Sequence, residues 1–293
     1  MKTFRTLGFI FIMVSSLSGN LLNEYTLAVS IYKLDNATQN RAKRLTLKTA
    51  KELSKTLKRK LNVIFIKDEE TLLKDYINFN KYNMMLNYPS FYLQNRDKLK
   101  ENSVNPFLFY NSGTQKTQYY LIANKKSKIK DISNLTNKSF SALSIDENYV
   151  TWLDYLIRKE FNTSYNNIVS KVKKVHKNDR LLLDVYFEKV DFTVVSKVVY
   201  DDISLLNPSI KKKLHIVTKS EPIFFFGLGV FHKSTPKELV DKFQEIIDNG
   251  VFNKKFSAVF RLLNMYDIQK TSFQELESVD RFYDEYLKLK RKE

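Results

Sequence analysis

Apolar residues follow two rhythms along this chain, a period of two that is typical of strands and a period near 3.6 that is typical of helices. The first strand is predicted over residues 26–32, and strands over residues 63–66 and 84–86 follow it. A helix is predicted over residues 37–60 because a stripe recurs there at helical spacing, at Ala42, Leu45, Thr49, Leu53, Leu57 and Leu61. A second helix begins after Asp68, which can cap it. This β-α-β-α-β order favours a parallel sheet with right-handed crossovers.

The rest of the chain repeats the alternation at a similar length. Strands are predicted over residues 118–123, 139–145, 169–175, 192–195, 214–217 and 223–231. Helices are predicted over residues 181–187 and 198–206, and along the face of Trp152, Leu153, Leu156, Ile157 and Phe161. Two more helices begin with capping-box patterns, at Thr235-Pro236-Lys237-Glu238 and at Ser272 with Glu275. We therefore expect an α/β protein with two units, each a mostly parallel sheet flanked by helices.

The first eighteen residues have the layout of a secretory signal peptide. Lys2 and Arg5 precede an apolar run over residues 7–14, and Ser16 and Ser18 place small residues before a cleavage site after Ser18. The run is shorter than the roughly 20 residues that a transmembrane helix needs. We expect export to the periplasm with cleavage, and a retained N-terminal anchor is the alternative.

Composition narrows the class of protein further. The chain has 293 residues and no cysteine, which excludes disulfides and lipid attachment at a cysteine. The formal net charge is +17, carried mostly by lysine. Proteins that recognise nucleic-acid bases favour the planar guanidinium group of arginine, and arginine is scarce here. We therefore expect a solvated lysine-rich surface and no nucleic-acid partner, and attraction to an anionic ligand or membrane surface is the alternative.

Motifs for catalysis, metals and cofactors are missing from the sequence. It contains no phosphate-binding loop, no Gly-x-Ser-x-Gly and no His-Glu-x-x-His. Gly227-Leu228-Gly229 lies inside an apolar stretch, which indicates a bend or close backbone approach. The three histidines lack the spacing of metal ligands, and the paired acids Asp146 and Glu147 alone do not make an active site. We expect no enzyme activity, no cofactor and no metal.

Polar residues cluster where predicted strands end and helices begin. Open α/β sheets bind ligands at the carboxyl ends of their strands, and N–H groups at helix starts suit anions. The candidate ligand-binding residues are Tyr32, Asn87, Tyr88, Ser90, Ser144, Asn148, Tyr149 and His176. For each of them an ordinary cap or turn role is the alternative. The set predicts a binding site for a small polar molecule.

Three stretches resemble the periplasmic solute-binding proteins of the phosphonate/phosphite-binding type. Residues 120–140 resemble a crossover strand followed by the family's I-x-x-L-x-x-L-x-G-K segment. His176 with Val190-Asp191 is similar to its H-D-x-x-L-x-x-V-x-x-G-x-V-D stretch, and residues 220–223 resemble S-x-P-I-P. One departure is that the family's Ser-Thr/Ser-Ser-Gly cluster is replaced at residues 144–149 by a segment with two acids and no glycine.

The resemblance implies a type 2 periplasmic binding fold with two lobes and a two-stranded hinge. Lobe 1 would comprise residues 19–118 and 224–293, and lobe 2 residues 119–223. The implied function is capture of a small polar, phosphonate-like ligand in a cleft between the lobes, for an ABC transporter. The alternative is a sensing module that presents the ligand to a membrane receptor or histidine kinase. The partners would be the ligand and a membrane permease or sensor, and we expect a monomer.

Overall fold

The computed structural model describes residues 24–78, 81–110, 116–143, 147–263, 265 and 267–292. The predicted signal peptide, residues 1–18, lies outside the described residues. The chain forms two compact units. Of the described residues, one comprises those between 24 and 87, 98–106 and 229–263, and the other comprises 88–97 and those between 107 and 228 and between 265 and 292. The lobe boundaries that the resemblance implies stay a prediction.

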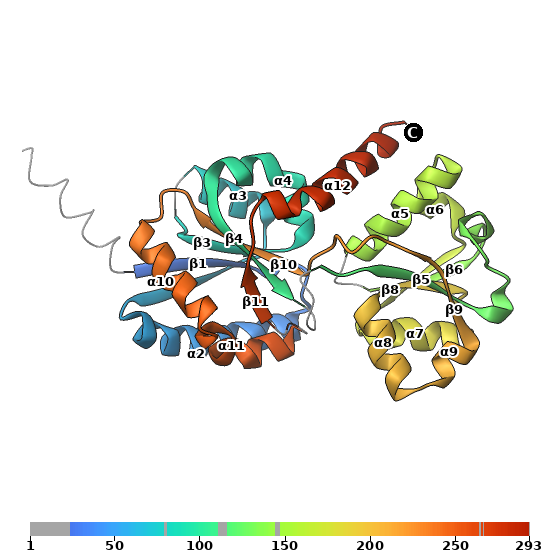
Figure 1. The fold of residues 1–293 in the computed structure, drawn as a ribbon, viewed down its shortest axis with the longest axis horizontal. Helices are drawn as coiled ribbons and strands as arrows, with labels where there is room; N and C mark the ends of the chain where they lie inside the picture. Colours follow the sequence, from blue (N-terminus) through green and yellow to red (C-terminus); the bar gives the residue numbers. More distant parts are fainter. Residues whose placement is uncertain are drawn as a thin grey trace, which may run out of the picture. The chain divides into compact units, whose positions relative to one another are not determined.

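A six-stranded sheet has the order β11-β4-β10-β3-β1-β2 (Figure 1). Its strands are β1 (Glu24–Ser30), β2 (Lys60–Ile66), β3 (Met84–Asn87), β4 (Ser103–Tyr110), β10 (Gly227–His232) and β11 (Asp267–Lys270). Strand β1 pairs in parallel with both β2 and β3, as the β-α-β-α-β pattern predicts. Strand β11 pairs antiparallel with β4. The sheet is therefore mixed, with a parallel part built from the first three strands.

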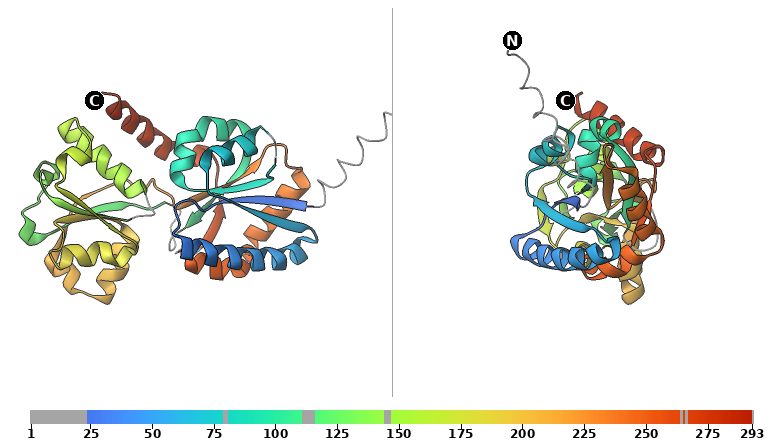
Figure 2. Two further views of the ribbon diagram at one scale, coloured as in Figure 1. Left: turned by 180° about the vertical axis from the view of Figure 1, so that it is seen from behind. Right: turned by 90° about the vertical axis from the view of Figure 1, so that its left-hand side faces the viewer.

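Helices cover both faces of this sheet. They are α2 (Asn36–Leu57), α3 (Glu69–Ile77), α4 (Pro89–Asn102), α10 (Lys237–Asp248) and α11 (Val251–Leu262). Helices α2 and α11 pack side by side on one face, and α3 lies on the other (Figures 1 and 2). The predicted cap at Asp68 is confirmed, because its carboxylate accepts the backbone N–H of Thr71 at 2.8 Å. Asp35 caps α2 in the same way.

A five-stranded sheet has the order β7-β6-β8-β5-β9. Its strands are β5 (Tyr119–Asn124), β6 (Ser139–Leu143), β7 (Lys171–Val175), β8 (Phe192–Ser196) and β9 (Leu214–Lys219). Strand β6 is parallel to β7 and β8, whereas β5 is antiparallel to β8 and β9. Helices α5 (Glu147–Phe161) and α6 (Tyr165–Ile168) lie on one face. Helices α7 (Asn178–Tyr186), α8 (Lys197–Leu206) and α9 (Ser209–Lys213) lie on the other (Figure 1).

Short turns and a C-terminal helix complete the described chain. The 3₁₀ turns are η1 (Lys125–Ser127), η2 (Ile132–Leu135) and η3 (Gln274–Leu276), and the last helix is α12 (Glu277–Lys290). The segments predicted to connect the lobes are hydrogen-bonded to each other. The N–H of Thr117 donates to the carbonyl of Phe224 at 2.7 Å, and the reverse bond is 3.3 Å. The α/β fold with two sheets is confirmed, and both sheets are mixed. No helix within the described ranges has the length and apolar character to cross a membrane.

One of the two predicted capping boxes is wrong. The hydroxyl of Thr235 donates to the carbonyl of Asn83 at 3.0 Å, and the residue that precedes α10 is Pro236, whose side chain has no polar atom to cap the helix. The second box is confirmed. The N–H of Ser272 donates to the carboxylate of Glu275 at 3.0 Å, and the N–H of Glu275 donates to the Ser272 hydroxyl at 3.2 Å. It precedes η3, which leads into α12.

Candidate functional site

Two predicted site residues lie at the carboxyl ends of adjacent strands in the six-stranded sheet. Tyr32 follows β1 and Asn87 is the last residue of β3, and the two strands run in parallel. Tyr32 is half-buried, and the Lys33 ammonium lies 5.3 Å from the centroid of its ring. This edge therefore combines an aromatic hydroxyl, an amide and a positive charge.

Asn87 has an unusual environment for a buried amide. Its side chain is only 6% exposed. Neither its Oδ1 nor its Nδ2 has a hydrogen-bond partner in the part of the chain that the structure describes. Buried polar groups are paired in the great majority of cases, and an unpaired one lowers stability. A polar group that is costly to folding and placed at a sheet edge is a strong candidate for ligand binding.

Helix α4 begins immediately after Asn87. The carbonyl of Tyr88 accepts the first helical hydrogen bond, from the N–H of Tyr92 at 3.2 Å. Pro89 opens the helix and Ser90 follows it, and both Tyr88 and Ser90 are partly exposed. The N–H groups of a first helical turn have no partner within the helix and favour negative charge. The start of α4 therefore adds hydrogen-bond donors beside the Asn87 amide.

The five-stranded sheet has its own edge of polar residues. Strands β6 and β7 are parallel and in register, with Leu143 opposite Val175. His176 follows β7 directly and is exposed. Ser144 follows β6 directly but lies outside the described residues, as does Asp146. The register places the end of β6, at Leu143, at the same edge of the sheet as His176.

The first turn of α5 lies at this edge. Asn148 and Tyr149 are 7% and 4% exposed. The ring of Tyr149 meets that of Tyr119 edge-on at 4.7 Å between centroids, and Tyr119 stacks on Phe224 at 4.3 Å. Tyr149 is thus part of an aromatic cluster. Packing of this kind holds the start of α5, and with it the amide of Asn148, in place.

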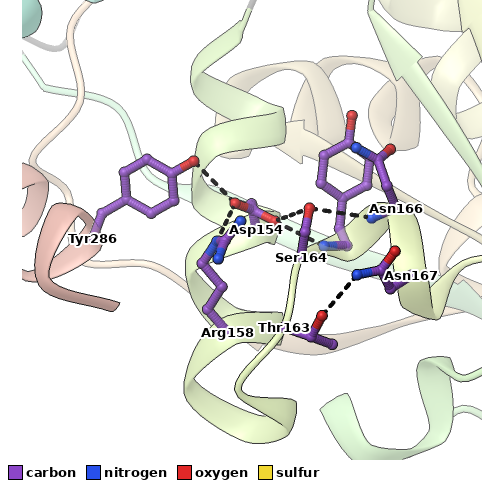
Figure 3. Close-up of polar contacts among 8 residues, drawn as sticks. Asp154, Arg158, Thr163, Ser164, Asn166, Asn167 and Tyr286 are labelled. Atoms are coloured by element: carbon purple, nitrogen blue, oxygen red, sulfur yellow. Dashed lines mark hydrogen bonds and ion pairs between the residues drawn. The ribbon is translucent and has the colours of Figure 1, made fainter. Parts of the chain in front are cut away.

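A buried carboxylate holds α5 further along its length (Figure 3). Asp154 accepts hydrogen bonds from Arg158 Nε at 2.6 Å and from the Tyr286 hydroxyl of α12 at 2.9 Å. It also accepts from the Ser164 hydroxyl at 3.2 Å and the Tyr165 N–H at 2.8 Å. Burial, and secondly the Asp154 charge, raise the pKa of Tyr286. These bonds join α5, α6 and α12, so they fix the helix whose first turn carries the candidate residues.

Sequence reasoning missed three polar residues at this second edge. Ser196 ends β8 and caps α8 through Val199, and Lys197 begins that helix. A hydrogen bond and ion pair with Asp201 raise the pKa of Lys197. Thr117 precedes β5, and its buried hydroxyl has no hydrogen-bond partner among the described residues. Only the register, which sets Tyr119 opposite Ser196, brings these residues to the carboxyl edge of β8.

The two polar edges suit binding better than chemistry. Within the described ranges, no group of three or more histidine or acidic side chains is arranged to hold a metal ion. The donors present are amides, hydroxyls, helix N–H groups and lysines. Such groups bind oxyanions without reacting with them.

Comparison with known proteins places the chain in a family. Residues 31–270 match the model described as ABC transporter, phosphonate, periplasmic substrate-binding protein. The chain belongs to this phosphonate-binding family. Its resemblance to the family, inferred from residues 120–140, 176–191 and 220–223, is confirmed. The members of this family are the binding components of transporters, so the protein is not an enzyme.

Solved structures share the fold of this phosphonate-binding family protein at low sequence identity. The binding-protein component of an ABC phosphonate transporter from Pseudomonas aeruginosa is 16% identical, with a TM-score of 0.56 over 92% of this chain and 94% of that one. PhnD1 from Prochlorococcus marinus, in complex with methylphosphonate, is 14% identical, with a TM-score of 0.58 over 88% and 96%. A Xanthomonas citri protein bound to ATP is 11% identical, with a TM-score of 0.61 over 92% and 98%. No curated protein matches the sequence.

Proposed function

We propose that this phosphonate-binding family protein captures a small oxyanion of the phosphonate class and delivers it to a membrane permease after export to the periplasm. The ligand would bridge the two lobes and stabilise their closed form, because its contacts with both are complete only there. The observation that carries the proposal is the buried amide of Asn87 at the carboxyl edge of the six-stranded sheet, which has no hydrogen-bond partner among the described residues.

The chemistry of a tetrahedral oxyanion fits the groups at the two edges. Most oxygens of a phosphonate accept hydrogen bonds at neutral pH, so its site must supply mainly donors. Asn87 Nδ2, the first N–H groups of α4 and the Ser90 hydroxyl would donate from one edge. The second edge would contribute Asn148, Tyr149, Ser144 and His176, and Tyr32 and Tyr88 would flank the ligand. These assignments come from placement at strand ends and helix starts.

The acids at positions 146 and 147 bear on the choice among phosphonates. Carboxylates beside a bare phosphonate are repulsive unless they point away or hold a cation. We therefore propose that an amino-substituted phosphonate binds more tightly than methylphosphonate. The amine would balance the acids while the phosphonate head occupies the donor groups.

Calorimetric titration of the exported protein tests the proposal. The ligands are 2-aminoethylphosphonate, methylphosphonate, phosphite, phosphate and methanesulfonate. The variant is Asn87→Ala, and the matched control is Asn102→Ala at the other end of α4, whose amide donates to the Lys98 carbonyl at 2.9 Å. A hydrogen bond to a charged ligand contributes about 1.5–3 kcal/mol, so Asn87→Ala should weaken binding roughly 10- to 100-fold. Asn102→Ala should leave the affinity unchanged.

Thermal unfolding of the ligand-free variants separates this role from a structural one. Because the Asn87 amide makes no hydrogen bond within the described chain, Asn87→Ala should leave the melting temperature unchanged or raise it. Lower stability together with full ligand affinity would assign Asn87 to the fold and contradict the proposal. Absence of binding for all five ligands would contradict the phosphonate class as a whole.

A further inference from the structure

Large hydrophobic side chains are exposed at the ends of two neighbouring helices of the five-stranded unit. Leu205 and Leu206 at the end of α8 are 82% and 85% exposed, and Phe187 after α7 is 61% exposed. These are the three most exposed large hydrophobic residues in the described part of the chain. Single exposed leucines are common on protein surfaces, but contiguous apolar patches mark contact surfaces. We call these three residues the apolar tip.

Helices α7, α8 and α9, whose ends carry or adjoin the apolar tip, are packed against one another. The ring of Phe187 meets that of Tyr186 edge-on at 5.0 Å. The Tyr186 hydroxyl is 2.9 Å from the Ser209 hydroxyl, three residues beyond Leu206. Figure 1 shows α7, α8 and α9 side by side on the same face of the sheet. The ends of α7 and α8 and the start of α9 thus form one surface.

Positive charge surrounds the apolar tip. Lys211, Lys212 and Lys213 are consecutive on α9 and all exposed, and the Lys213 ammonium lies 4.4 Å from the centroid of the Tyr186 ring. Lys189 is also exposed beyond α7. Three acids lie nearby. Glu188 pairs with Lys126 at 2.9 Å, Asp201 pairs with Lys197, and Asp202 is exposed one turn before Leu206. The lysines outnumber these acids, so the surface is amphipathic and basic.

We propose that the apolar tip and the three lysines of α9 form a docking surface for an anionic phospholipid membrane. Leucine and phenylalanine side chains flanked by lysines are typical of segments that lie in the membrane interface. The apolar side chains enter the boundary of the acyl region, and the ammonium groups meet lipid phosphates. Lysine suits this task because flexible point charges can follow a fluid array of phosphates, whereas arginine forks favour fixed partners. The surface would keep the binding protein close to the membrane in which its permease lies.

Vesicle co-sedimentation of the exported protein tests this surface. The vesicles contain phosphatidylcholine with about 30% phosphatidylglycerol, or phosphatidylcholine alone, at low salt. Each lysine near an anionic surface contributes about fivefold, so Lys211→Gln, Lys212→Gln and Lys213→Gln together should lower the partition coefficient roughly 100-fold. Leu205→Ser with Leu206→Ser should lower it about tenfold. The lysine variant and the leucine variant are both measured on both kinds of vesicle.

Because the formal net charge is +17, vesicles could attract the whole protein, so a charge-matched control elsewhere on the chain is needed. Lys51, Lys55 and Lys58 lie with the half-exposed Leu47 around an open basic depression at the end of α2. Changing these three lysines to glutamine removes the same charge and should alter partitioning less than about threefold. Ligand affinity and melting temperature, measured on every variant, should stay unchanged because all the altered side chains are exposed.

Three outcomes would overturn the proposal. The first is an equal loss of partitioning in the α2 control, which would show diffuse attraction by net charge. The second is unchanged partitioning in the leucine variant. The third is tip-dependent capture on polyglutamate beads without binding to vesicles, which would assign the surface to an acidic protein. Loss of ligand binding through Asn87→Ala is measured separately, so failure of one proposal leaves the other standing.

Discussion

Replacing Asp154 by alanine should destabilise the protein more than any exposed carboxylate replacement. The Asp154 carboxylate pairs with Arg158 at 2.6 Å, and both side chains are only 5% exposed. Removing the acid leaves the guanidinium buried without this partner, and it deprives Ser164, Tyr165 and Tyr286 of an acceptor.

The magnitude follows from this burial. Breaking a buried ion pair by removing one partner costs about 3–5 kcal/mol. For a chain of this length, 1 kcal/mol shifts the melting temperature by about 2–4 °C. Asp154→Ala should therefore lower it by about 6–20 °C in a calorimetric or fluorescence melt. Tyr286→Phe removes one donor and should cost about 1 kcal/mol.

Asp201→Ala is the matched control. Asp201 also pairs with a cation four residues away on one helix, Lys197, but these side chains are 45% and 53% exposed. Surface pairs of this kind contribute about 0–1 kcal/mol. Equal melting temperatures for Asp154→Ala and Asp201→Ala would refute the reasoning, because burial would then have no effect on the strength of the pair.

Two further predictions follow from single residues. Burial, and secondly the charge of Lys233, lower the pKa of His232 in the folded protein from its ordinary value of 6.5. The unfolded chain therefore binds more protons, so stability should fall as the pH drops below about 6.5 towards the folded pKa, and His232→Gln should flatten a series of melts between about pH 7.5 and 5.5. Asp68→Ala should cost about 1 kcal/mol, since its carboxylate caps Thr71 at the start of α3, and an unchanged urea midpoint would contradict this.

Elements with a strong periodic pattern were predictable from the sequence. The parallel β1, β2 and β3 with their helices follow from local patterns, because each can bury its apolar face only against its sequence neighbours. Strand β4 escaped prediction because Asn105 has a positive φ of 50° and Pro106 interrupts the apolar run. Its partner β11 has four residues with little apolar character, and its antiparallel pairing with residues 107–110 alone makes it a strand.

The candidate site divides in the same way. The sequence placed polar residues after β1, β3 and β7, because topology determines where parallel strands end. It also identified the family, whose fold tolerates wide divergence in sequence. Three other features depend on neighbours that are distant along the chain. They are the lack of a partner for the Asn87 amide in the described chain, the bond from Thr235 to Asn83 and the exposure of Leu206. Pattern and spacing are local properties, whereas burial and hydrogen-bond partnership arise only when distant segments pack, so the tertiary structure alone decided them.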